Sequence, residues 1–153
     1  MRIERSDYRV IHVPENKEPP SIVKGVMTKP VITIDKSQYV YEAAKMMSSK
    51  GIGCIIVMDG KRPVGMATER DILQRVVAKG LDASKVEMKN IMSKPLIIIK
   101  GNTPIINAVR EMQRKNVRHL PIMEKGELVG IVTQRDLLRA LALHVLISFR
   151  PLL

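Results

Sequence analysis

The sequence predicts a mixed fold of the α+β or α/β class, made of two β-α-β-β-α repeats whose sheets pack together with pseudo-two-fold symmetry. The main observation is a motif that occurs twice, at residues 65–71 and 130–136. Both copies read glycine, two apolar residues, threonine, any residue, arginine and aspartate. With the copies superposed, the chain aligns with itself without a gap over roughly fifty residues, and about a third of the positions match. The chain therefore contains a duplicated unit.

The first repeat is predicted to cover residues 21–80. Its apolar residues recur at helical spacing from Val40 to Met47, and Lys50-Gly51 is a typical helix C-terminus. Asp59-Gly60 is a strong signal for a turn between two strands. In chain order we expect a helical lead-in at 21–27, strand 31–34, helix 37–50, strands 54–58 and 63–68, and helix 69–78.

After a polar linker at 81–87, the same order of elements is predicted for residues 88–146. It comprises a helical lead-in at 88–92, strand 96–99, helix 104–115, strands 119–123 and 127–133, and helix 135–146. One three-stranded sheet with helices on a single face leaves its other apolar face uncovered, and packing two such sheets together solves this problem.

Both ends of the chain lie outside the two repeats. Residues 1–20 are expected to form an arm with one possible strand at 8–13, and residues 147–153 a tail. The stretch 141–153 is too apolar for a free end, so we expect it to form a dimer contact or pack on its own chain, with docking on a membrane as the alternative.

Composition limits the class of protein. Of 153 residues, 45% are hydrophobic, and no apolar run is long enough to span a membrane. The first residues lack the apolar region of a signal peptide, and the single cysteine, Cys54, lies in an apolar run. We expect a buried structural thiol and a cytoplasmic protein. The net charge of +11 favours a phosphorylated partner, nucleotide or nucleic acid, although a generally basic surface explains it equally well.

The repeated motif also suggests a binding site. In each copy a strand runs directly into a helix, so a threonine hydroxyl and an aspartate carboxylate lie together at a helix N-terminus. Such a terminus favours an anionic ligand, and a carboxylate accepts hydrogen bonds from sugar hydroxyls. The alternative for Thr68 and Thr133 is an N-cap and nothing more, and Asp71 and Asp136 would then only favour the helix dipole.

These residues resemble the cystathionine β-synthase (CBS) domain family in its tandem form, the Bateman module. The resemblance rests on Met-Thr/Ser-Lys-Pro before each first strand, on Leu120-Pro121 and the residues after it, and on the doubled Gly…Thr-x-Arg-Asp element. It implies a stand-alone CBS pair that forms a disk-shaped homodimer. It also implies AMP, ADP or ATP in the clefts between the repeats, ahead of S-adenosylmethionine or NAD, with Thr68 and Asp71, or Thr133 and Asp136, on the ribose and phosphate.

In the family, basic residues before Leu-Pro often reach phosphate, and here these are Arg118 and His119. Their first-repeat counterparts, Gly53 and Cys54, carry no charge. The better nucleotide site is therefore predicted to combine Thr133, Asp136, Arg118 and His119, with Val117 and Ile52 as apolar walls for adenine. The alternatives are a solvated strand-edge residue for Arg118 and a packing residue for His119.

The predicted function is a regulatory module that senses adenine nucleotides and passes a shape change to an unknown protein partner. The alternative is a nucleic-acid-binding or scaffold protein that uses its basic surface. We expect neither catalysis nor a metal site, because no nucleophile–base pair, metal-ligand cluster or phosphate-binding glycine loop stands out.

Overall fold

The computed structural model describes residues 20–148, so the possible strand at 8–13 and the end of the tail lie outside the described residues. It confirms the predicted repeats. The first contains β1 (Thr33–Asp35), α1 (Val40–Lys50), β2 (Cys54–Asp59), β3 (Arg62–Thr68) and α2 (Glu69–Arg75). The second contains α3 (Ile105–Lys115), β4 (His119–Glu124), β5 (Glu127–Thr133) and α4 (Gln134–Ser148). Three 3₁₀ helices complete the order: η2 (Val23–Gly25), η3 (Val77–Lys79) and η4 (Met88–Asn90).

The two sheets share a topology but differ in one strand. β1 pairs with β2 in parallel and β2 with β3 antiparallel, whereas β4 and β5 form a two-stranded antiparallel sheet. The expected strand at 96–99 is reduced to a single bridge, in which Ile99 N donates to Pro121 O at 3.0 Å. Leu96 of this segment packs between the two repeats, as its first-repeat counterpart Val31 does just before β1.

The helix C-termini follow the sequence signals. α1 ends at Gly51, which adopts a left-handed conformation with φ 61°, as the Lys50-Gly51 pair predicts. In α3 the corresponding position is Asn116, also left-handed with φ 52°. Asparagine is the residue that most readily replaces glycine there, so both helices turn back toward the following strand.

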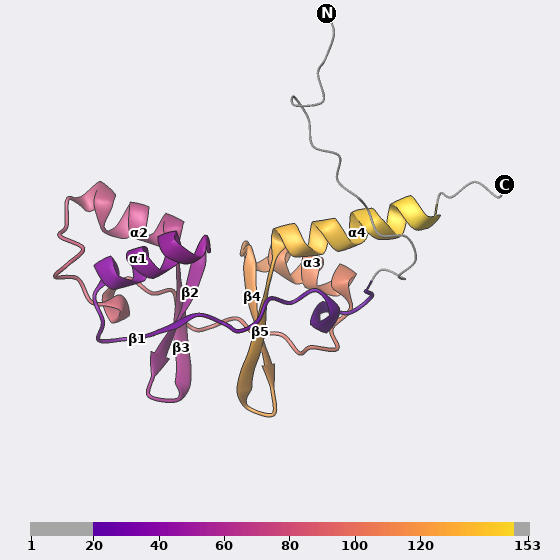
Figure 1. Ribbon diagram of the computed structural model, residues 1–153, viewed down its shortest axis with the longest axis horizontal. Coiled ribbons are helices and arrows are strands. Elements are labelled where there is room, and N and C mark those ends of the chain that lie inside the picture. The colour runs from indigo at the N-terminus through magenta and orange to yellow at the C-terminus, as the bar shows by residue number, and fades with distance from the viewer. Residues whose placement is uncertain (1–19, 149–153) are drawn as a thin grey trace, which may run out of the picture.

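The lead-in segments are exchanged between the repeats. Val23 N of η2 donates to Thr103 O at 3.0 Å, and in the symmetric contact Met88 N of η4 donates to Gln38 O at 2.8 Å. Val23 is buried in the core of the second repeat and Met88 in that of the first. In Figure 1 the chain accordingly crosses from one lobe to the other before β1 and again before α3. Each lobe is therefore completed by the other repeat.

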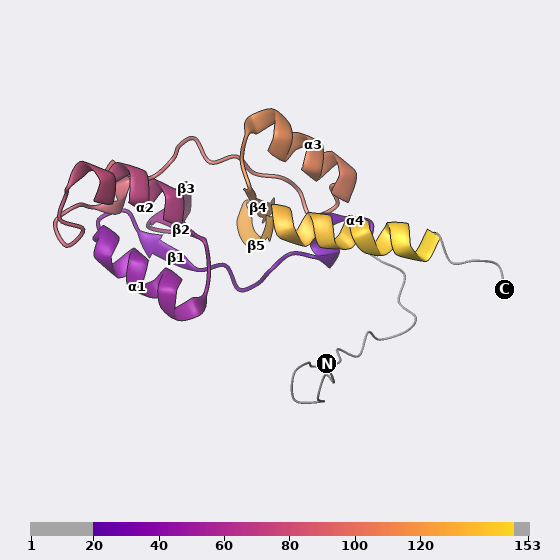
Figure 2. The ribbon, with the colours of Figure 1, turned by 90° about the horizontal axis from the view of Figure 1, so that it is seen from above.

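The repeats meet through their sheets, as predicted. Cys54 and Ile56 of β2 pack against Ile131 of β5, and all three are buried. We call these three residues the inter-repeat interface. Figure 2 shows the helix pairs flanking the strands, with the two crossing segments on opposite sides. Cys54 is 8% exposed, which confirms a buried thiol, and burial together with the charge of Glu69 raises its pKa to about 12.

The repeated glycines are required by these crossings. Thr28 bridges Ile131, and the symmetric pair is Ser93 with Met66. A Cβ added to Gly65 would lie 2.7 Å from Met92 Sδ and 3.0 Å from the Ser93 carbonyl oxygen. The repeated Met-Thr/Ser segment thus packs directly on the repeated glycine, and Gly130 makes the corresponding contact with the Met27 side chain.

Candidate functional site

The Thr and Asp of each motif bond to one another. In the first repeat the backbone N and Oγ1 of Thr68 each donate to Asp71 Oδ2 at 2.9 Å, and Asp71 N donates back to Thr68 Oγ1 at 3.2 Å. In the second repeat the same three bonds join Thr133 and Asp136, at 2.9, 2.7 and 3.2 Å. Both pairs are reciprocal helix caps. The hydroxyls and one carboxylate oxygen of each pair are therefore already engaged.

Other backbone groups at these helix starts are also engaged. Glu69 N donates to Gly53 O at 3.1 Å, and Gln134 N donates to Arg118 O at 2.9 Å. Two of the first three amides of each helix are thus satisfied within the protein. An anion could use them only by breaking the cap, so the carboxylate is the better ligand group at each site.

The remaining carboxylate oxygen differs between the repeats. Asp71 Oδ1 lies 3.2 Å from an Arg75 nitrogen, one helical turn on. Arg75 also donates to the Ile91 carbonyl oxygen at 2.6 Å. In the second repeat the position of Arg75 is taken by Ala140, which is buried. Within residues 20–148, Asp71 is ion-paired with Arg75 whereas Asp136 forms no ion pair, although Arg139, three residues further on, lines the neighbouring pocket. The replacement of Arg75 by Ala140 is already visible when the two repeats are aligned.

A pocket of about 190 Å³ lies beside Asp136. We call it the Asp136 pocket, and its walls come from α4 and from the lead-in that the first repeat supplies. At its outer edge His144 Nε2 lies 3.0 Å from Pro20 O, a contact that no sequence signal suggested. The lining residues are Pro20, Val26, Asp136, Arg139, Ala140 and Leu143.

His119 lies where the two repeats meet. It pairs with Thr133 across the β4–β5 ladder, and its Nε2 approaches Gly53 of the first repeat. Burial lowers the pKa of His119 below its ordinary value, Arg118 lowers it further, and the carboxylates of Asp136 and Glu69 offset part of this. The ring is therefore a neutral hydrogen-bonding group near neutral pH.

The other predicted residues are spread over both lobes. Arg118 is exposed, and its backbone carbonyl accepts the first amide of α4. Val117 is half-buried against the core of the second repeat, whereas Ile52 packs against the core of the first. The charge of Asp136 acts on His119, whereas Val117 and Ile52 pack against separate cores. Of the residues predicted for the site, Asp136 is the one that lines the pocket beside it.

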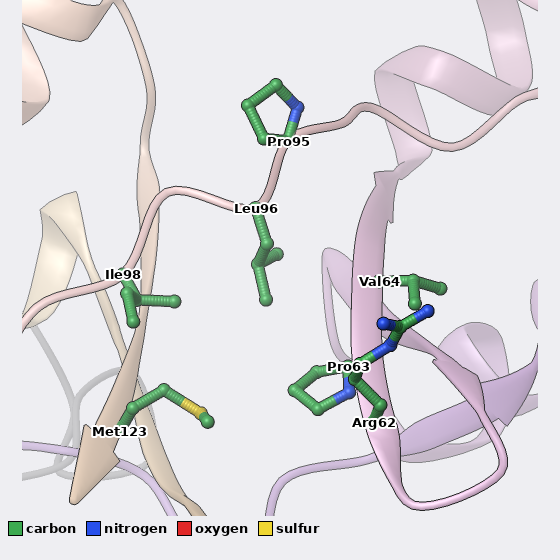
Figure 3. Close-up of a pocket in the computed structure, with 7 residues that line it drawn as sticks. All are labelled: Arg62, Pro63, Val64, Pro95, Leu96, Ile98 and Met123. Carbon is green, nitrogen blue, oxygen red and sulfur yellow. The ribbon is translucent and has the colours of Figure 1, made fainter. Parts of the chain in front are cut away.

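A larger cavity of about 360 Å³ opens near the hairpin ends of the sheets. Figure 3 shows Leu96 of the crossing segment above the space, with Ile98 and Met123 on one side and Pro63 on the other. Arg62 is the single charged residue of its lining. The cavity offers apolar contact but no carboxylate for a sugar, and it contains none of the predicted site residues.

The fold and the two capped motifs define a pair of CBS domains. The sequence profile of the CBS domain matches residues 23–78 and 88–143, so the chain belongs to this family. It is 36% identical over 117 residues to the CBS domain-containing protein YhcV of Bacillus subtilis, covering 76% of this chain and 83% of YhcV. It is also 36% identical over 119 residues to a protein of Methanopyrus kandleri, covering 76% of this chain but only 61% of the relative.

Solved structures of CBS proteins share the fold. The CBS domain protein of Pyrobaculum aerophilum, determined in complex with AMP, superposes with a TM-score of 0.72 at 29% identity, over 82% of this chain and 98% of that one. The CBS domain pair of protein MJ0100, in complex with 5′-methylthioadenosine and S-adenosylmethionine, gives a TM-score of 0.72 at 27% identity, over 80% and 98%. Within residues 20–148, none of the helices combines the length and apolarity needed to cross a membrane.

Proposed function

We propose that this chain is a regulatory module that binds an adenine nucleotide beside Asp136. The observation that carries the proposal is the carboxylate of Asp136, which has one oxygen outside the helix cap and borders a pocket. A carboxylate accepts hydrogen bonds from two vicinal hydroxyls, as a ribose presents them.

The ligands of the relatives support an adenosine group. AMP, 5′-methylthioadenosine and S-adenosylmethionine, the ligands in the two solved neighbours, all contain adenosine. We place AMP, ADP or ATP ahead of S-adenosylmethionine and NAD for this chain, because its net charge of +11 favours a phosphorylated ligand. Arg118 is the candidate for phosphate contact, and His119, close to Asp136, would donate or accept one hydrogen bond.

Regulation would follow from the exchanged lead-ins. The pocket beside Asp136 is bounded by α4 and by Val26, which precedes the first crossing segment. A ligand there contacts the second repeat and the chain that leads into the first, so it favours one arrangement of the two lobes. The module would act on a protein partner without performing catalysis itself.

We further propose a homodimer that covers apolar side chains of α4. The helix extends beyond the second lobe (Figure 2), and several exposed apolar side chains gathered on one element are typical of an interface between subunits. The exposed residues are Leu138, Leu143, Val145, Leu146 and Ile147.

Isothermal titration calorimetry with AMP, ADP and ATP tests the proposal. We expect saturable binding by the wild type and a loss of about tenfold or more in Asp136→Asn, since the neutral amide accepts weaker hydrogen bonds. Asp82→Asn is the control, because Asp82 is an exposed loop carboxylate that bonds to Ser84. If no adenosine compound binds the wild type at millimolar concentration, the proposal is wrong.

The nucleic-acid alternative makes a different prediction for the same proteins. Binding of a short RNA through the basic surface would weaken steeply with salt and would not respond to Asp136→Asn. Repeating the titrations with RNA at two salt concentrations therefore separates the two functions.

A further inference from the structure

Three residues of the Asp136 pocket have exact structural counterparts in the first repeat. Val26, Asp136 and Ala140 correspond in the aligned repeats to Ile91, Asp71 and Arg75. Two of these pairs are chemically similar: Val26 and Ile91 are apolar lead-in residues, and Asp136 and Asp71 are capping aspartates. The third pair differs in size and charge. The other lining residues, Pro20, Arg139 and Leu143, align with Lys85, Gln74 and Ala78, but of all these first-repeat counterparts Arg75 is the one that is ion-paired with the capping aspartate.

In the first repeat the arginine side chain lies within the counterpart of the pocket. One Arg75 nitrogen lies 3.2 Å from Asp71 Oδ1, and another donates to the Ile91 carbonyl oxygen at 2.6 Å. The guanidinium therefore joins the same two walls, helix and exchanged lead-in, that border the pocket in the second repeat. The carboxyl side chain of Asp71 is only 14% exposed.

We infer that Arg75 is a built-in occupant of the first-repeat pocket, so that each chain binds one adenine nucleotide, at Asp136, rather than two. This inference rests on the proposed function and adds its stoichiometry and the residue that sets it. Asp71 Oδ2 accepts the two cap bonds of Thr68, and Asp71 Oδ1 is paired with Arg75. A ribose at Asp71 would have to displace a charge-assisted contact, whereas a ribose at Asp136 would not.

The size of the difference follows from this contact. A ribose that displaces the charged Arg75 contact from Asp71 is expected to bind there about tenfold more weakly, or less well still, than a ribose at Asp136. Arg75 is half-buried, so its truncation leaves the cap of α2 and the core of the first repeat in place. Arg75→Ala should therefore give the first repeat the same open pocket that Ala140 gives the second.

Four variants test this by calorimetry and by equilibrium dialysis with AMP. Ala140→Arg should close the Asp136 pocket and abolish binding, while Ala142→Arg, the same substitution at an exposed position of the same helix outside the pocket lining, should retain it. Arg75→Ala should raise the stoichiometry from one AMP per chain to two. The double variant Arg75→Ala/Ala140→Arg should bind one AMP. Adding Asp71→Asn to this variant should abolish the binding, whereas adding Asp136→Asn should leave it unchanged.

The outcomes separate this inference from the proposed function. A wild type that binds two AMP per chain, or an Arg75→Ala variant that still binds one, overturns the inference and leaves nucleotide binding intact. A wild type that binds none of AMP, ADP and ATP refutes both. Ala140 is buried, so Ala140→Arg could fail to fold; Arg75→Ala and its stoichiometry then decide the question alone.

Discussion

The imidazole of His119 lies directly over Gly53, with Nε2 3.7 Å from the position that a Cβ on Gly53 would take. A carboxylate oxygen of Glu69 lies 3.8 Å from the same point. The starts of β2 and β4 therefore lie close together. His119, the first residue of β4, also lies near Glu69, the first residue of α2. This contact links the two repeats, and the charge of Asp136 acts on the same imidazole.

Protonation of His119 should destabilise the protein. Burial lowers its pKa in the folded state, and the neighbouring Arg118 acts in the same direction, while Asp136 and Glu69 oppose them. A lowered pKa contributes stability above the ordinary value of 6.5, and this stability is lost as the pH falls through the folded pKa. Urea unfolding at several pH values should show stability falling below about pH 6.5.

His119→Gln supplies the control for this effect, because glutamine keeps a polar group and cannot titrate. The difference in unfolding free energy between wild type and variant should narrow or reverse as the pH drops. A difference that stays constant from pH 7.5 to pH 5 would contradict the assignment of a buried, neutral imidazole.

The fold could be predicted from the sequence to a large extent, because the duplication repeats every local signal. The Lys50-Gly51 helix end and the Asp59-Gly60 turn are local features, and the structure contains both. The exchanged lead-ins could not be predicted in this way. Val23 and Met88 are apolar residues in short segments, and nothing local tells which of two equivalent cores will bury them.

Gly65→Ala should destabilise the protein by about 1–3 kcal/mol, the cost of an added methyl group that meets a packed neighbour. Its Cβ would lie 2.7 Å from Met92 Sδ and 3.0 Å from the backbone carbonyl oxygen of Ser93. Gly53→Ala is the matched control, since its Cβ would find only ordinary contacts at 3.7 and 3.8 Å. Chemical denaturation of both variants measures their losses of unfolding free energy. Equal losses would show that the crossing segment moves aside to accommodate the added methyl group at little cost.

The site was harder to predict than the fold, because its chemistry depends on which atoms are already used. The sequence shows a threonine and an aspartate in both motifs, yet the caps engage one oxygen of each carboxylate in bonds within the chain. The pairing of Arg75 with Asp71 is a one-turn contact that the spacing allowed. The effect of this pairing on ligand binding becomes clear only from the structure, in which Ala140, the counterpart of Arg75, lines the pocket beside Asp136.

The thiol of Cys54 should be inert in the folded protein. Burial raises its pKa to about 12, so the reactive thiolate is scarce at neutral pH. Iodoacetamide should label the native chain slowly at pH 8 and the urea-unfolded chain quickly. Because the folded pKa lies above the ordinary value of 9.0, the thiol's contribution to stability is present below pH 9 and is lost as the pH rises toward 12.

Cys54→Ala should remove this alkaline loss while lowering stability at neutral pH through lost packing. If wild type and variant lose stability in parallel above pH 9, ionisation of other groups accounts for the whole effect. Rapid labelling of the native protein would show that the inter-repeat interface opens more often than its burial suggests.

Adjacent leucines on α4 should behave in opposite ways. Leu137 is fully buried in the core of the second repeat, whereas Leu138 is 52% exposed on the next face of the helix. Leu137→Ala removes packed methyl groups and leaves a cavity, so we expect a loss of about 2–5 kcal/mol in unfolding free energy. Leu138→Ala should cost less than about 0.5 kcal/mol in the monomer, since a surface substitution leaves no cavity.

If α4 forms the dimer contact, Leu138→Ala should instead weaken self-association in sedimentation equilibrium. An effect on neither stability nor association would show that this face of α4 meets only solvent.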